Sequence, residues 1–205
     1  MKALLYVSAA IAAYLVAGWN PAITFSKAIY KKDIRTCGSG NPGFTNFRRT
    51  FGNKWAWHVL VLDLSKAAVV VGVFAWLFGK YFDNYQFGAA YTGLFAMLGH
   101  AFPIWYKFNG GKGFLVSMSI IWFIDWRAGL IALFLMLLLL FTTKYMSLAT
   151  VTAMLTSLIV LLIVNTQPSV VCIYAACVLL MVVRHKENIK RLINKSETKF
   201  EVKSH

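Results

Sequence analysis

The sequence predicts an all-α, polytopic integral membrane protein with about seven transmembrane helices, an outer N-terminus and a cytosolic C-terminus. The first observation is composition: 59% of the 205 residues are hydrophobic and 14% are charged, whereas soluble domains carry about 25% charged residues. A chain of this length could not bury so much apolar surface in water. The other two observations are the lengths of the apolar stretches and the one-sided distribution of the basic residues between them.

The apolar stretches divide into seven candidate spans, most of them near the roughly 20 residues that a transmembrane helix needs. They cover residues 3–24, 55–79, 84–104, 112–126, 127–143, 146–164 and 167–184. We interpret the first as a span and not as a cleaved signal peptide, because no convincing cleavage site follows it. Pro21 is expected to kink or end that span. The fourth is short and follows three glycines, which predicts a re-entrant or irregular start. No linker is visible, so residues 1–205 are expected to form one domain.

The basic residues predict the orientation. The formal net charge of +14 would suggest nucleic-acid binding in a soluble protein, but here the cations gather on one side of the membrane and no nucleic-acid partner is expected. The opposite side has Lys2, Lys80 and Arg127. The positive-inside rule then predicts a cytosolic C-terminus and an odd number of spans. The cation-rich side holds Lys27, Lys31, Lys32, Arg35, Arg48, Arg49, Lys54, Lys107, Lys112, Lys144, Arg184, Lys186, Lys190, Arg191, Lys195, Lys199 and Lys203.

The first inner loop, residues 38–49, has the composition of an anion site. Its glycines let backbone N–H groups converge on one point, and Arg49 can hold a phosphate with two parallel hydrogen bonds. An ordinary turn followed by helix capping is the alternative, but donors this dense beside an arginine favour function. The glycines are Gly38, Gly40 and Gly43, and the side-chain donors are Ser39, Asn41, Thr45 and Asn46.

The second inner segment contains Gly110, Gly111, Lys112 and Gly113 before an apolar stretch. Such a loop can also cradle a phosphate, with the lysine as a point charge. It is not a Walker A loop, because that spacing is absent. His100 precedes this segment, and alone it would more often be structural than catalytic.

The third segment leaves the last span. His185 and Asn188 are three residues apart and so share one helical face, with Arg184 and Arg191 on the same broad side and Glu197 following. A basic tail on anionic lipid is the alternative. It would account for the lysines of this segment but not for the histidine and the asparagine.

Ionisable residues inside the second span indicate either function or pairing. Asp63 and Lys66 are three apart, and such groups are costly in a span; a functional role and a structural ion pair are left as equal alternatives, and the depth of Asp63 favours a polar cavity that opens inward. His58 and Asp63 match the HxxxxD pattern found in some glycerolipid acyltransferases. We reject that match, because residues five apart on a helix point about 140° from each other and base catalysis needs them close together.

The three segments together resemble one family, the bacterial acyl-phosphate:glycerol-3-phosphate acyltransferases of the PlsY type, over almost the whole chain. The first two signatures match at Gly38, Ser39, Gly40, Asn41, Gly43, Thr45, Asn46 and Arg49, and at Gly99, His100, Pro103, Phe108, Gly110, Gly111, Lys112 and Gly113. The third matches at Arg184, His185, Asn188, Ile189, Arg191, Leu192, Glu197 and Lys199, and shorter elements match at Asp63, Lys66, Lys144 and Ser147. The departures are Pro42, Phe44, Ala67 and Asn109, of which Asn109 removes a cation usual before the Gly-Gly-Lys segment.

This resemblance implies an enzyme of the bacterial cytoplasmic (inner) membrane with its active site on the cytosolic face. It would move a fatty acyl group from acyl phosphate to the sn-1 hydroxyl of glycerol 3-phosphate among membrane lipids, without a cofactor or a metal. We expect Ser39, Asn41, Lys112, His185 and Asn188 to be catalytic. Substrate or phosphate binding is expected of Gly38, Gly40, Gly43, Thr45, Asn46, Arg49, Lys66, His100, Gly110, Gly111, Gly113, Arg184, Arg191 and Glu197.

Two rivals are left open. A small transporter or channel for phosphate-containing solutes or lipids would also need basic groups, but its polar residues should follow a path through the bilayer. A ligand-binding membrane scaffold is the weaker alternative.

The acyl transfer that the resemblance implies needs no covalent enzyme intermediate, because an acyl phosphate is already activated and catalysis can rest on positioning and charge neutralisation.

Overall fold

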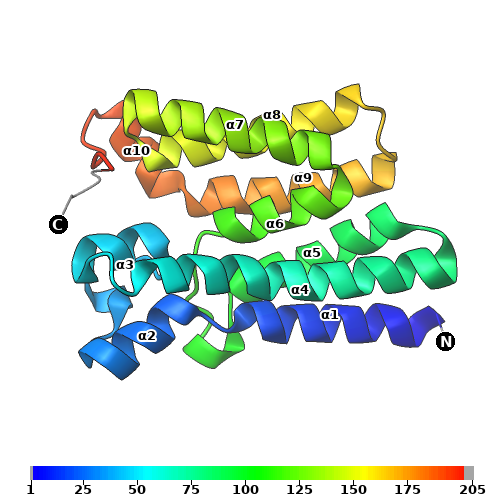
Figure 1. Ribbon diagram of the computed structural model, residues 1–205, viewed down its shortest axis with the longest axis horizontal. Coiled ribbons are helices and arrows are strands. Elements are labelled where there is room, and N and C mark those ends of the chain that lie inside the picture. The colour runs from blue at the N-terminus through cyan, green and yellow to red at the C-terminus, as the bar shows by residue number, and fades with distance from the viewer. Residues whose placement is uncertain (1, 201–205) are drawn as a thin grey trace.

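The computed structural model describes residues 2–200, and within that range the chain is helical with no strands. Figure 1 shows the helices side by side in a bundle, with the start of α1 at one end and α10 at the other. Lys203 lies outside the described residues. The elements are α1 (Lys2–Gly18), α2 (Pro21–Tyr30), η1 (Ile34–Thr36), α3 (Phe44–Phe51), α4 (Ala56–Phe82), α5 (Tyr85–Ala101), η2 (Ile104–Tyr106), α6 (Phe114–Ile124), α7 (Trp126–Thr143), α8 (Met146–Ile163), α9 (Pro168–Arg184) and α10 (Lys186–Ile193).

Each expected apolar stretch contains a helix, but they do not all qualify as spans. Five segments are long and apolar enough to cross a bilayer, and α9 with α10, bent by 57°, would make a sixth. The 11 residues of α6 reach about 16 Å at 1.5 Å per residue, whereas the hydrocarbon core is about 30 Å thick. The irregular start expected before α6 is confirmed, and the total of seven spans stays a prediction.

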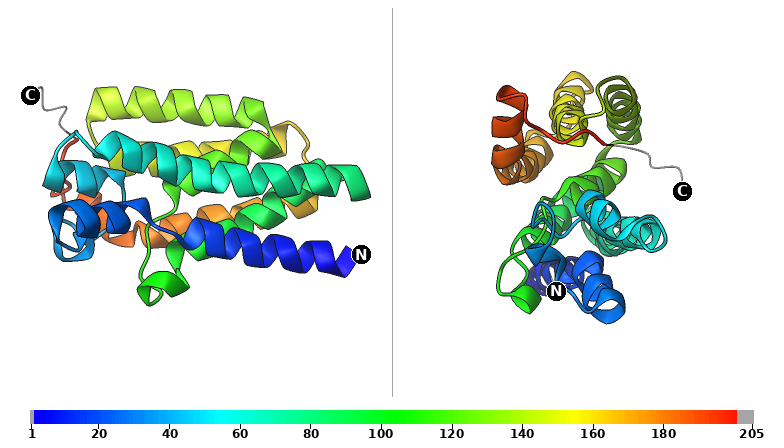
Figure 2. Two further views of the ribbon diagram at one scale, coloured as in Figure 1. Left: turned by 60° about the horizontal axis from the view of Figure 1, so that its bottom comes forward. Right: turned by 90° about the vertical axis from the view of Figure 1, so that its left-hand side faces the viewer.

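The helices form two groups that meet along α6 and where α5 packs against α9. On one side α4 packs against α1 and α5, and on the other α8 packs against α7 and α9, while α6 contacts helices of both groups. The end-on view in Figure 2 shows this division. Small residues let the helices approach closely: Ala9, Ala13 and Ala17 of α1 are fully buried, and a Cβ at Gly99 of α5 would collide with the Tyr14 carbonyl.

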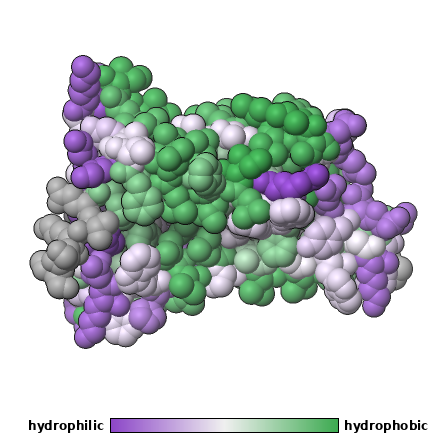
Figure 3. Space-filling view, turned by 45° about the horizontal axis from the view of Figure 1, so that its top comes forward, coloured by the Kyte–Doolittle hydropathy of each residue, from purple (hydrophilic) through white to green (hydrophobic). Residues whose placement is uncertain are grey.

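An apolar belt surrounds the bundle, as expected for a protein whose solvent is lipid. Figure 3 shows hydrophobic side chains across the middle and hydrophilic ones gathered towards the two ends. Large apolar residues such as Val69, Phe134 and Leu162 are more than 60% exposed. The cation-rich elements α2, α3 and α10 share one end of the molecule (Figure 1), which fits the predicted asymmetry. The side of the membrane that this end faces stays a prediction.

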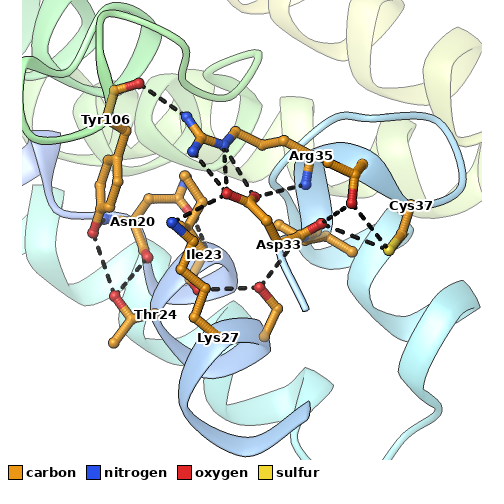
Figure 4. A network of polar contacts seen from close by, with 11 residues as sticks. Asn20, Ile23, Thr24, Lys27, Asp33, Arg35, Cys37 and Tyr106 are labelled. Carbon is orange, nitrogen blue, oxygen red and sulfur yellow. Dashed lines mark hydrogen bonds and ion pairs between the residues drawn. The ribbon is translucent and has the colours of Figure 1, made fainter. Parts of the chain in front are cut away.

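A polar network fixes the loop that follows α2 (Figure 4). Arg35 forms an ion pair with Asp33 at 2.7 Å and donates to the Tyr106 carbonyl at 2.9 Å. The side-chain hydrogen bond with Arg35 lowers the pKa of Asp33 well below its usual range. Asn20 caps α2 just before Pro21, where the first span was expected to break, and donates to the Pro42 carbonyl at 3.0 Å. The glycine-rich loop therefore has fixed anchors at both of its ends.

Candidate functional site

A cleft of about 1090 Å³ lies between α3 and α4 on one side and α7 and α8 on the other. Its apolar walls include Phe44, Trp57, Leu60, Phe114, Leu115, Met136, Leu137, Leu140, Phe141 and Met146. Its polar lining includes Ser39, Asn41, Thr45, Asn46, Arg48, Arg49, Lys112, Lys144, Ser147, His185, Asn188, Arg191 and Glu197. All three predicted polar segments thus meet in one cavity that is polar in one part and apolar in the other.

The glycine loop at the cleft has a backbone that other residues rarely adopt. Gly38 and Gly40 have φ of +54° and +71°, in the left-handed region that favours glycine. Asn46 is buried and accepts from the Ser39 N–H at 3.0 Å while donating to the Cys37 carbonyl at 2.9 Å. Its side chain therefore shapes the loop instead of presenting its amide to a ligand.

The N-terminus of α3 opens onto the same part of the cleft. Gly43 occupies the N-cap position and no side chain caps it, so the first N–H groups of the helix are available to an anion. Arg49 also lines this region, and its guanidinium has no hydrogen-bond or ion-pair partner among residues 2–200. The helix start and the arginine together can accept a phosphate.

Lys112 enters the cleft from the opposite loop. Its ammonium donates a short hydrogen bond to Oδ1 of Asn188 in α10. Burial and the neighbouring cation Arg191 lower the pKa of Lys112 to about 8. A cation held against other cations in a partly buried place is stabilised by a bound anion.

Glu197 organises the third segment. Its Oε1 accepts from Asn188 at 2.7 Å and from the Ser147 hydroxyl at 2.8 Å, and its Oε2 accepts from Arg191 at 2.7 Å. Although burial alone would raise its pKa, these hydrogen bonds lower it below the usual range of a glutamate. The carboxylate fixes side chains of α8 and α10 around the polar part of the cleft.

His185 lines the cleft with a defined orientation. Its Nδ1 is 2.8 Å from the Met181 carbonyl, which can only accept, so Nδ1 carries the proton and Nε2 of the neutral ring is left as an acceptor. His185 is 5% exposed. The ring therefore offers one basic nitrogen at the wall of the cleft.

Several predicted binding residues do not line the cleft: Gly40, Lys66, Gly110, Gly111 and Arg184. Lys66 pairs with Asp63 at 2.8 Å, and both Asp63 and the predicted binding residue His100 reach the cleft wall, so the pair is ionic and one of its members borders the site. Arg184 donates to the carbonyls of Gly110 and Gly111. His58 is exposed beside Trp55 whereas Asp63 is buried, which agrees with the rejection of the HxxxxD match.

Sequence reasoning did not select some residues that line the cleft, chiefly Arg48, Ser147 and Phe200. Ser147 was matched only as part of a short loop element, although its position at the start of an apolar helix beside Lys144 was a usable signal. Among the described residues no group of three or more His, Cys, Asp or Glu side chains is placed to hold a metal ion.

A cationic polar region that opens into an apolar cleft, inside a bundle with lipid-facing walls, defines an integral membrane protein with an amphipathic cavity. The family model for glycerol-3-phosphate acyltransferase matches residues 7–195. The chain therefore belongs to the glycerol-3-phosphate acyltransferase family.

Individual relatives agree over nearly the full length. The glycerol-3-phosphate acyltransferase of Thermoanaerobacter sp. (strain X514) is 36% identical over 193 residues, which cover 94% of each chain. That of Pelagibacter ubique is 34% identical over 198 residues, which cover 96% of this chain and 98% of the relative. Two crystal structures of PlsY (YgiH), an integral membrane glycerol 3-phosphate acyltransferase, superpose with a TM-score of 0.83. The glycerol 3-phosphate form is 30% identical and covers 96% of each chain; the lysophosphatidic acid form is 28% identical, covering 96% of this chain and 95% of the other.

Proposed function

We propose that this protein transfers a fatty acyl group from acyl phosphate to the sn-1 hydroxyl of glycerol 3-phosphate, giving lysophosphatidic acid and phosphate, the first acylation of bacterial phospholipid synthesis. The observation that carries the proposal is the single cleft that joins two cationic, glycine-flanked cradles to an apolar groove. Similar proteins solved with glycerol 3-phosphate and lysophosphatidic acid support it.

The two phosphates have separate partners in this proposal. Arg49, the Ser39 loop and the start of α3 form one cradle, and Lys112 with Asn188 forms the other. Each cradle combines a cation with neutral donors, which suits a phosphate oxygen better than a carboxamide or a sugar hydroxyl. Two such cradles in one cavity fit a reaction in which both substrates carry a phosphate.

The acyl chain would lie along the apolar walls. Leu60 of α4 and Met136 and Leu140 of α7 all line the cleft. A saturated chain gains about 0.8 kcal/mol for each CH₂ that it buries, but a chain that comes from a bilayer gains much less. The groove therefore serves mainly to align the reactive carbonyl with the polar part of the cleft.

The chemistry balances without an enzyme-bound intermediate. The sn-1 hydroxyl oxygen attacks the carbonyl carbon, the new C–O ester bond forms, and the C–O bond to phosphate breaks. The leaving phosphate takes the electron pair, and the hydroxyl proton passes to it either directly or through Nε2 of His185. Arg49, Lys112 and the loop N–H groups would stabilise the charge that builds on the carbonyl and phosphate oxygens.

Residues 1–205 would act as one domain in the bacterial inner membrane, with the cation-rich end and its site in the cytosol. No cofactor takes part. The polar lining of the cleft belongs to elements at that one end, which favours an enzyme over a transporter that needs a polar path across the bilayer.

The test is phosphate release by detergent-purified protein given acyl phosphate and glycerol 3-phosphate together and separately. We expect release only with both substrates, matched by lysophosphatidic acid in equal amount. Lys112→Ala should lose at least a hundredfold in kcat/KM, whereas Lys107→Ala, which removes an exposed lysine outside the cleft, should retain activity. Absence of release, with uptake of either compound into vesicles, would instead favour a transporter.

A further inference from the structure

Asp63, Lys66 and His100 form a buried ionic cluster beside the loop that carries Lys112. The lysine of this cluster does not line the cleft. Asp63, Lys66 and His100 are 4%, 7% and 4% exposed. The Lys66 ammonium donates to the Trp19 carbonyl at 2.6 Å, lies 3.2 Å from Nδ1 of His100 and forms an ion pair with Asp63 at 2.8 Å. A buried ion pair is costly compared with apolar packing, so its retention points to a task beyond packing.

His100 connects this cluster to the backbone of the second cradle. Because an ammonium only donates, Nδ1 of the neutral ring accepts from Lys66, which leaves Nε2 on the edge turned towards Gly111. A Cβ at Gly111 would collide with that Nε2, so the ring packs directly on the glycine. The His100 carbonyl also accepts from the Gly111 N–H at 3.1 Å. The imidazole and its own backbone therefore hold one side of the loop.

Arg184 holds the same loop from α9. Its guanidinium donates to the Gly110 carbonyl at 2.7 Å and to the Gly111 carbonyl at 3.2 Å. It lies over Phe102, with 5.5 Å from the guanidinium carbon to the ring centroid. The two glycines are thus clamped between an imidazole of α5 and a guanidinium of α9, immediately before Lys112.

The clamp supplies support that the loop lacks. Residues 107–113 form no helix, so a regular hydrogen-bond ladder does not fix the direction of Lys112. The lysine nevertheless reaches Asn188 across the cleft.

We propose that Arg184 and His100, the latter held by the Asp63–Lys66 pair, are positioning residues that fix the Gly110–Gly111 peptide and so aim Lys112 into the cleft. Both act through Lys112: the Arg184 guanidinium does not line the cleft, and the His100 ring, which borders the cleft, acts through its contact with Gly111. This inference rests on the proposed function only for its kinetic test, because the order of the loop can be measured without catalysis.

The kinetic test compares variants of the full-length protein in detergent. Lys112→Ala first identifies the substrate whose KM depends on this lysine. Arg184→Lys keeps the charge but cannot bridge two carbonyls as a planar fork does. It should raise the KM for that same substrate about tenfold and change the other KM less than twofold. The matched control is Arg127→Lys at the other end of the bundle, where a pair with Asp125 is altered without effect on either KM.

The structural test is amide hydrogen exchange of residues 110–113, read by mass spectrometry. We expect Arg184→Lys and His100→Asn to exchange about tenfold faster there, with a melting temperature within a few degrees of the parent. His100→Asn leaves an acceptor for Lys66 but no ring against Gly111. The paired change Asp63→Asn with Lys66→Met removes both charges together and should give the same local increase.

The outcomes separate the two proposals. Exchange at residues 110–113 equal to that of the parent in Arg184→Lys and His100→Asn overturns the positioning role, as does a rise in the KM of the substrate that Lys112 does not control. If the parent protein transfers no acyl group, the proposed function fails, while the exchange comparison still decides the positioning role.

Discussion

The guanidinium carbon of Arg48 lies 4.6 Å from the centroid of the Phe200 ring. Arg48 belongs to α3, and the Phe200 N–H donates to the carbonyl of Lys144, between α7 and α8, at 2.6 Å. The segment that follows α10 therefore links α3 on one wall of the cleft to the turn between α7 and α8 on the other. The end-on view in Figure 2 shows this segment leaving α10 and running across that end of the bundle. Glu197 lies on this segment, so the contact at Phe200 helps to keep the carboxylate in the site.

Loss of the Phe200 ring should loosen this segment. A cation–π contact at a partly exposed place contributes about 0.5–1 kcal/mol, so we expect Phe200→Ala to raise the KM of a phosphate substrate roughly 2–5-fold. Phe200→Trp should restore the parent value. The control is Phe134→Ala, a side chain 68% exposed on the lipid-facing wall. Equal KM values for Phe200→Ala and the parent would show that the ring does not hold the segment.

The negative charge of Glu197 should contribute to kcat/KM through its hydrogen bond with Arg191. Glu197→Gln keeps an acceptor for Ser147 but weakens the ionic hydrogen bond from Arg191. Hydrogen bonds to charged groups contribute about 1.5–3 kcal/mol, so kcat/KM should fall roughly 10–150-fold. Glu187→Gln removes an exposed carboxylate in α10 and serves as the control. Steady-state kinetics measure both, and equal activity of the two variants would contradict the role of Glu197.

The pH dependence should report Lys112. Its pKa is lowered to about 8, mainly by burial, so the free enzyme carries the cation below that pH and loses it as the pH rises through 8. We expect kcat/KM for the substrate bound by Lys112 to fall above about pH 8. Lys112→Arg keeps its charge at these pH values and should remove the fall, whatever its absolute rate. A profile with the same basic limb in both proteins would assign that limb to another group.

The apolar wall should set the acyl-chain preference. Leu140 lines the cleft, and Leu140→Trp would fill part of the groove. We expect kcat/KM for long-chain acyl phosphates to fall at least tenfold while short-chain donors retain theirs. Leu138 is 46% exposed and does not line the cleft, so Leu138→Trp is the matched control. A uniform loss over all chain lengths would place the acyl chain elsewhere.

Local sequence patterns predicted the helices and most of the cleft. The break expected near residue 125 is present because Asp125 accepts from the N–H groups of Arg127 and Ala128 and so caps α7. Three polar segments far apart in sequence meet in one cavity, as their shared chemistry suggested. These features depend on short-range periodicity, capping and charge, all of which can be read along the chain.

The roles of Lys66 and Arg184 could not be predicted in the same way. Both are cations near glycine-rich or polar segments, which favoured phosphate binding. Their main partners include backbone carbonyls of Trp19, Gly110 and Gly111, up to 74 residues away in sequence. Because every residue has a carbonyl, a partner of this kind leaves no mark in the sequence. The length of α6 could not be predicted from the sequence for a related reason. Lys112 and Gly113 border an apolar stretch but fold as part of the loop, with Gly113 at φ +90°.

The side walls of the cleft carry exposed aromatic side chains. Trp57 of α4 and Phe141 of α7 both line the cleft and are 55% and 72% exposed, while each of these helices packs against other partners. The apolar part is therefore a slot with an open edge and not a closed tunnel. A single-chain amphiphile held there can slide sideways into one leaflet, so its departure would depend on the fluidity of the surrounding lipid and would require no carrier in water.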